Sequence, residues 1–140
     1  MPLWQQFINQ GNQLFTHKKW GDALGYYNKA VSLLEDAMKT EITDIQQIIQ
    51  GWICAYHNIA STYEQQGLIE LSRDALMTPF HHMLALSRDP TTTEAIQLAA
   101  NSALTITLPP LFAFAKKNPN EFAFINQVIE QLNIHQPLNE

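Results

Sequence analysis

The chain has 140 residues, of which 46% are hydrophobic and 15% are charged, and its formal net charge is −5. This composition fits one globular domain with its own core, and the negative balance disfavours nucleic acid or an anionic membrane surface as a partner. The single cysteine, Cys54, excludes an intramolecular disulfide and a cysteine-based zinc site.

The first two predicted helices form a hairpin. Apolar or small residues recur at spacings of three and four, at Leu3, Phe7, Gly11 and Leu14. This spacing places them along one face of a helix. The segment "THKK" interrupts this stripe, and a second stripe follows at Ala23, Tyr27, Ala30, Val31 and Leu34. Because the connection is so short, the two helices are expected to pack as antiparallel neighbours.

A second, longer hairpin is predicted next. Thr43, with Gln46 three residues later, has the pattern of a capping box and predicts the start of a long third helix. Gly67 predicts its end. The fourth helix meets Pro79, which predicts a kink or a short break near Met77 before the helix runs on to about Ser87.

The C-terminal third is predicted to be helical as well. Asp89-Pro90, or Thr91 with Glu94, are the candidate caps of a fifth helix that runs to about Leu108. The pair Pro109-Pro110 then predicts a bend or a new start. Asn118 and Pro119 predict the start of a last helix, whose apolar positions are Phe122, Ile125, Val128, Ile129 and Leu132.

The two hairpins share a spacing. The first gives Phe7-x2-Gln10-Gly11-x2-Leu14 and then Ala23-x3-Tyr27, and the second gives Tyr56-x2-Ile59-Ala60-x2-Tyr63 and then Ser72-x3-Leu76. Nine positions separate Leu14 from Ala23, and nine separate Tyr63 from Ser72. A small residue on each facing helix would let the two backbones approach closely.

These residues resemble the tetratricopeptide repeat family, whose pattern is W-x2-L-G-x2-Y followed by A-x3-F. The resemblance implies an all-α fold of stacked antiparallel hairpins, with units at about 3–38 and 43–88, a degenerate unit at 91–117 and a capping helix at 119–133. Gly11 and Ala60 are 49 positions apart, whereas the family repeats about every 34 residues. The extra 15 residues are therefore expected between Glu35 and Gln50, as longer helices.

The resemblance also implies a partner-binding groove along the first and third helices, lined by Ile8, Asn12, Phe15, Cys54, His57, Asn58 and Ser61. Family members that grip a carboxylate of their partner have asparagines at the positions of Asn12 and Asn58. They also have a lysine where this chain has Ile8, and basic residues in the third unit that this chain lacks between 89 and 115. The expected ligand is therefore an apolar helix or extended peptide rather than an acidic tail, and the expected role is an adaptor or small chaperone.

The segment from Ala95 to Ala115 carries no charge and is long enough to cross a bilayer. Its polar residues and its proline pair favour burial against neighbouring helices or a partner subunit instead. A structural homodimer that buries residues 95–115, with no peptide ligand, is the alternative to the binding module.

No catalytic, metal or cofactor chemistry is expected. The histidines, including His57, His81 and His82, show no i, i+4 pair on one helix, and the five glycines form no phosphate-binding loop. Cys54 is expected to be a buried, inert thiol. Because no catalytic motif is present, a non-enzymatic protein is expected. The first ten residues lack the regions of a signal peptide and the lone cysteine suits a reducing compartment, so a cytoplasmic location is expected.

Overall fold

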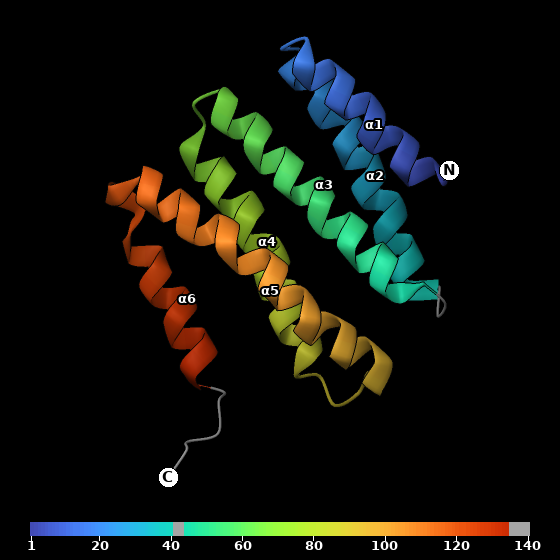
Figure 1. Cartoon of the computed structure of the whole chain (residues 1–140), viewed down its shortest axis with the longest axis vertical. Helices are drawn as coiled ribbons and strands as arrows, with labels where there is room; N and C mark the ends of the chain where they lie inside the picture. The colour runs from blue at the N-terminus through green and yellow to red at the C-terminus, as the bar shows by residue number, and fades with distance from the viewer. Residues whose placement is uncertain (41–43, 135–140) are drawn as a thin grey trace.

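The computed structural model describes residues 1–40 and 44–134, and these residues form helices and no strand. The all-α class predicted from the sequence is confirmed. The elements in chain order are α1 (Leu3–Thr16), α2 (Trp20–Thr40), α3 (Ile45–Gln65), α4 (Ile69–Ser87), α5 (Glu94–Lys117), the 3₁₀ helix η1 (Pro119–Glu121) and α6 (Ala123–Ile134) (Figure 1).

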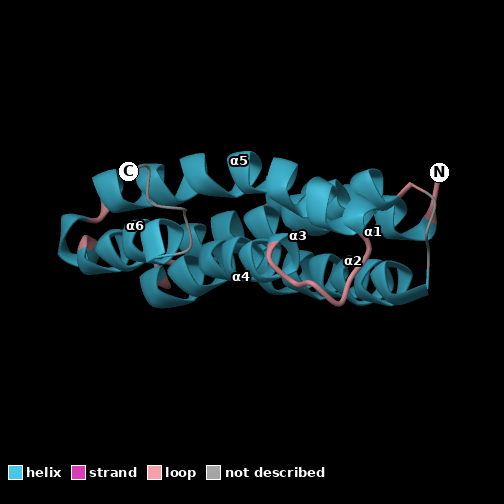
Figure 2. Ribbon diagram, turned by 90° about the horizontal axis from the view of Figure 1, so that it is seen from below, coloured by secondary structure: helices cyan, strands magenta, loops and turns pink. Residues whose placement is uncertain are grey.

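The helices stack in two layers. Helices α1, α3 and α5 form one layer, and α2, α4 and α6 form the other (Figure 2). From α1 to α5 each helix packs against the next in the chain, and α3 also contacts α1 and α5. One continuous core joins the described helices, with Trp52 of α3 and Phe80 of α4 among its largest fully buried side chains. The predicted stack of antiparallel hairpins is confirmed.

The two hairpin turns have the same backbone geometry. Lys18 and Gly67 both adopt the left-handed conformation, with φ of 60° and 76°. In the first turn the Lys19 N–H donates to the Leu14 carbonyl at 2.9 Å, and 49 residues later the Leu68 N–H donates to the Tyr63 carbonyl at 2.9 Å. Both are Schellman motifs, which satisfy the last carbonyls of α1 and α3. The 49-residue spacing therefore corresponds to a repeated structural unit.

Small residues lie where the paired helices meet. Gly11, Ala23, Ala60 and Ser72 are all buried. A Cβ atom added at Gly11 would lie 2.5 Å from Cε1 of Tyr27, so only glycine leaves room for that ring. In the second hairpin the Ser72 hydroxyl donates to the Ala60 carbonyl at 2.9 Å. The expected close approach of the helices is present in both hairpins.

Helices α2 and α3 are long, and they extend furthest at the end opposite the turns. Helix α2 continues to Thr40 and α3 begins at Ile45, so each has 21 residues. Thr43, the predicted cap of α3, lies outside the described residues. Asp44 directly precedes α3, and its side chain makes no capping hydrogen bond in the described structure.

Prolines do not break the helices. Helix α4 continues through Pro79, and α5 continues through Pro109 and Pro110, so neither the predicted break near Met77 nor a new start after Leu108 occurs. Pro79 is fully buried, and the burial of the α4 residues that follow it offsets the lost hydrogen bond. Residues 91–117 thus contribute one long helix.

The C-terminal region differs in detail from its prediction. The side chain of Thr93, rather than of Asp89 or Thr91, caps α5 by accepting from the Ile96 N–H at 3.2 Å. Pro119 begins the short helix η1 instead of α6. The buried residues of α6 are Phe124, Ile125 and Val128, whereas Phe122 and Ile129, two of the apolar positions predicted for the last helix, are exposed.

Candidate functional site

A pocket of about 260 Å³ opens between α1, α2 and α3 near the hairpin turns. Its lining residues are Asn12, Phe15, Thr16, Tyr27, Asn58 and Ser61. Three helices contribute to it, so it exists only in the folded stack. None of the described side chains that line it carries a charge. The pocket therefore offers amide, hydroxyl and aromatic groups to a ligand.

Gly11 determines how the pocket is built. Because residue 11 has no side chain, the ring of Tyr27 packs directly on the α1 backbone. The Tyr27 hydroxyl then donates to Oδ1 of Asn12 at 2.7 Å. Burial, together with the neighbouring Cys54, raises the pKa of Tyr27 to about 12, so the hydroxyl keeps its proton at neutral pH. The phenol consequently holds the Asn12 side chain in one orientation.

Asn58 joins the same hydrogen-bond cluster from α3. Its Nδ2 donates to Oδ1 of Asn12 at 3.3 Å and lies 3.9 Å from Sγ of Cys54. The Asn12 oxygen therefore accepts from two groups. Within the described part of the chain, Nδ2 of Asn12 and Oδ1 of Asn58 make no hydrogen bond. One amide donor group and one amide acceptor are thus free at the pocket.

The structure brings four of the predicted groove residues together: Asn12, Phe15, Asn58 and Ser61. Phe15 also packs edge-on against Trp20, with ring centroids 5.0 Å apart, and so forms a firm wall where α1 meets α2. Two residues of the pocket, Thr16 and Tyr27, were not among the predicted set. Gly11 could have predicted the place of Tyr27, because the space that a glycine leaves on one helix is filled by a bulky side chain of the facing helix.

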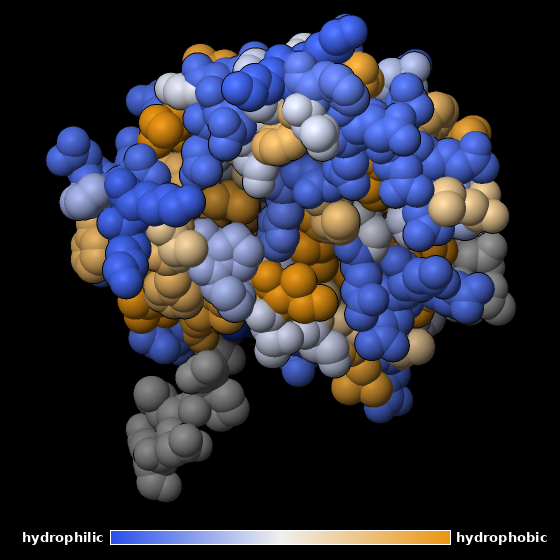
Figure 3. Space-filling model, turned by 45° about the horizontal axis from the view of Figure 1, so that its top comes forward, coloured by the Kyte–Doolittle hydropathy of each residue, from blue (hydrophilic) through white to orange (hydrophobic). Residues whose placement is uncertain are grey.

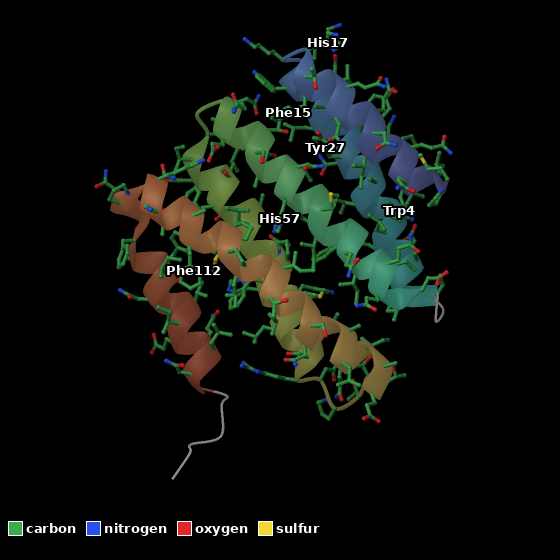
Figure 4. All side chains as sticks on the ribbon, in the orientation of Figure 1. Trp4, Phe15, His17, Tyr27, His57 and Phe112 are labelled. Atoms are coloured by element: carbon green, nitrogen blue, oxygen red, sulfur yellow. The ribbon has the colours of Figure 1, made fainter. Side chains whose placement is uncertain are left out.

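Ile8 and His57 do not line the pocket. Ile8 is 6% exposed and belongs to the core, so it cannot meet a ligand. His57 lies on α3 toward α5 (Figure 4), half-buried, and its Nε2 is buried without a partner in the described structure. Burial lowers the pKa of His57, which keeps the imidazole neutral at pH 7.

Cys54 differs from its prediction in one respect. Cys54 is exposed, although a buried thiol was expected. Burial of the sulfur nonetheless raises the pKa of the Cys54 thiol, so the thiol stays protonated and poorly nucleophilic. Cys54 can contribute contacts to the Asn58 side chain but not thiolate chemistry at neutral pH.

A second, smaller pocket of about 170 Å³ lies on the other side of Ser61, between α3, α4 and α5. Ala60, Ser72 and Pro110 are among its lining residues, and the Nζ of Lys117 approaches Oε1 of Glu64 at 3.7 Å across it. Viewed with the hairpin-turn end brought forward, the surface shows apolar hollows among mostly polar side chains (Figure 3). Ser61 therefore lies between two hollows.

Residues 1–40 and 44–134 contain no group of three or more His, Cys, Asp and Glu side chains that would suit a metal ion.

Comparison with known proteins gives a family and no function. A family model described as "Protein of unknown function (DUF2753)" matches residues 2–138, so the chain belongs to that family. No curated protein and no solved structure matches the chain.

Proposed function

We propose that this member of the DUF2753 family is a non-enzymatic, cytoplasmic interaction module that binds a peptide or helix of a partner protein. The binding site is the pocket of Asn12, Phe15, Tyr27, Asn58 and Ser61. An adaptor or small chaperone is the corresponding cellular role.

The observation that carries this proposal is the fixed amide pair. Tyr27 orients Asn12, and Asn12 in turn accepts from Asn58, so the amide groups are held before a ligand arrives. A side-chain amide offers the same donor and acceptor as a peptide bond, and it can therefore pair with the main chain of an extended segment. Groups held in place in advance lose little entropy on binding.

The uncharged lining sets the class of ligand. A carboxylate or phosphate in this pocket would meet no cationic side chain among the described lining residues. Removing such an ion from water without a partner is costly. The favoured ligand is accordingly a neutral segment whose apolar side chain packs on Phe15 while its main chain contacts the two amides.

Peptide display on the purified protein tests the proposal. Selected peptides should bind the wild-type chain and lose binding to Ser61→Trp, because the indole fills a pocket of about 260 Å³ from an exposed position. The matched control is Gln46→Trp, an exposed position of α3 about 22 Å along the same helix. Peptides that bind Ser61→Trp as well as Gln46→Trp would contradict the proposal, as would peptides that require a C-terminal carboxylate.

The asparagines give a second measurement with the same peptides. Asn58→Ala should weaken binding about three- to tenfold, the loss expected for one hydrogen bond. Asn9→Ala, an exposed asparagine one turn from Asn12 on α1 that does not line the pocket, should leave the affinity unchanged. Equal affinities for wild type and Asn58→Ala would show that the Asn58 amide does not contact the peptide.

The structural homodimer remains the second candidate function. It depends on another surface, the outer face of α5, and is independent of the pocket between α1, α2 and α3.

A further inference from the structure

The outer face of α5 is unusually apolar for an exposed surface. Helix α5 is the one helix among the described residues that is long and apolar enough to span a membrane, yet only 33% of its most apolar 18-residue stretch is buried. Leu98, Ile106 and Phe112 are 60%, 41% and 44% exposed. Figure 4 shows Phe112 on α5, on the side away from α3. This face therefore lacks a partner within the described chain.

The exposed residues repeat with a heptad-like spacing. Leu98, Thr105 and Phe112 are seven residues apart, and Ser102 and Pro109 fall between them at spacings of three and four. All five are exposed, so they form one stripe along the helix. Such a stripe is the seam that a second helix would cover at a crossing angle of about 20°.

The stripe is symmetric about Thr105. Leu98 and Phe112 lie seven residues before and after it, and Glu94 and Lys116 lie eleven residues before and after it. In two α5 helices that run antiparallel and cross at Thr105, Leu98 of one copy faces Phe112 of the partner subunit. Glu94 likewise faces Lys116 of the partner subunit. A parallel arrangement would place like charges together instead.

The charges at the ends fit this pairing. Glu94 and Lys116 are both exposed, and neither forms an ion pair in the described structure. The neighbouring Lys117 differs, because it approaches Glu64 of α3. Between these ends the stripe carries no charge, so a second copy would bury no unpaired ion.

We propose that the chain forms an antiparallel homodimer in which α5 packs on α5 of a second copy, with the two-fold axis at Thr105. The hydroxyl groups of Thr105 from the two copies meet at the axis, and the two Leu98–Phe112 contacts flank them. The two Glu94–Lys116 pairs close the ends. This dimer is independent of the peptide-binding proposal.

The dimer should be weak. Helix α5 has 24 residues and is thus about 36 Å long. A single crossing of two such helices buries about half of the 1,200–2,000 Å² that a standard protein interface buries. We therefore expect monomer and dimer to coexist at micromolar concentrations. Sedimentation over a range of concentrations is the corresponding measurement.

Disulfide trapping tests the geometry without disturbing the fold. In a Cys54→Ser background, Thr105→Cys should crosslink to itself, because the two residues face each other at the axis. Ser102→Cys is the matched control on the same stripe. Residue 102 faces residue 108 of the second copy, so two residues 102 are about 9 Å apart along the axis and too distant for a disulfide.

A mixed sample tests the direction of the helices. Leu98→Cys and Phe112→Cys should each crosslink poorly alone and should crosslink to each other when mixed. Efficient self-crosslinking of Leu98→Cys and of Ser102→Cys would mean a parallel pair and overturn the proposal. A protein that stays monomeric at all concentrations but sediments with neutral phosphatidylcholine vesicles would overturn it in favour of a membrane.

Charge reversal gives a second, independent test. Glu94→Lys and Lys116→Glu should each raise the dissociation constant about two- to tenfold, the effect expected for two exposed ion pairs. The double variant should restore the wild-type value, because it exchanges the charges across the same axis. A double variant that dimerises no better than either single one would exclude the antiparallel register, and the melting temperature of each variant shows whether it is folded.

Discussion

The side chain of Tyr27 lies directly against the backbone of Gly11, so that a Cβ atom at residue 11 would sit 2.5 Å from the aromatic ring. Tyr27 is 1% exposed and is held by its bond to Asn12, so the ring cannot move aside easily. This contact joins α1 to α2 and also builds the candidate pocket. The packing of α1 on α2 and the proposed peptide site therefore depend on the same glycine.

Gly11→Ala should destabilise the protein by about 1–3 kcal/mol, the cost of an overpacked contact. The control is Gly25→Ala, where an added Cβ meets nothing within 4 Å and the helix of α2 gains about 0.5–1 kcal/mol from alanine. Chemical denaturation of both variants measures the difference. Equal stabilities for the two would mean that the ring does not lie on residue 11.

Tyr27→Phe should cost about 1 kcal/mol at pH 7, because it leaves Oδ1 of Asn12 with one donor fewer. Above pH 10 the difference should shrink. The pKa of Tyr27 is raised to about 12 in the folded protein, so an unfolded tyrosine ionises first and the wild type loses stability as the pH rises from 10 to 12. Denaturation at pH 7, 10 and 11 checks both statements, and a constant difference would argue against a buried phenol.

Acid should weaken the fold partly through His57. Burial lowers the pKa of His57 below its ordinary value of 6.5, so in acid the unfolded chain takes up a proton that the folded chain excludes. The stabilising contribution is present above pH 6.5 and is lost as the pH falls through the lowered pKa. His57→Gln should therefore lose less stability than wild type between pH 7.5 and 5, as measured by chemical denaturation at both pH values, and equal losses for the two proteins would contradict the burial of His57.

Arg73 should anchor the C-terminal helices. Its Nη1 donates to Oε2 of Glu121 at 2.7 Å, and the two side chains are 28% and 24% exposed. A double-mutant cycle of Arg73→Ala and Glu121→Ala should give a coupling of about 1 kcal/mol after allowance for solvent screening. The cycle with Asp74, which is 63% exposed, should give a value near zero. A larger coupling energy with Asp74 than with Glu121 would mean that Glu121 is not the main partner of Arg73.

Local sequence patterns predicted the first half of the fold well. Helix period and turn chemistry are local, so the sequence indicated the stripe of Gly11 and Leu14, the turn at Gly67 that follows α3, and the 49-residue spacing. The expectation of long α2 and α3 helices came from comparing the 49-residue spacing with the shorter period of the tetratricopeptide family. Four pocket residues followed from the family resemblance, which supplied the direction in which each helix faces.

The prolines and Ile8 show what local patterns cannot predict. Pro109 and Pro110 deprive the carbonyls of Thr105 and Ile106 of their helical donors, yet both residues are exposed in the single chain, so water can satisfy those carbonyls there. Whether Ile8 faces a groove or the core depends on the angle at which α1 meets α3. Trp4 fixes that contact: a Cβ at Gly51 would lie 2.7 Å from its ring, a relationship between residues 47 positions apart.

The repeated Schellman turns have a consequence for how such a chain can vary. Both turns lie at one end, so residues added to α2 or α3 at the opposite end would leave the hairpin geometry unchanged. At that opposite end α2, α3, α4 and α5 enclose a mainly apolar hollow of about 230 Å³ that includes Met38, Ile49 and Leu86. Insertion of whole helical turns into α2 and α3 can therefore change the end of the molecule with this hollow, while the end with the hairpin turns and the Asn12–Asn58 pocket keeps its dimensions.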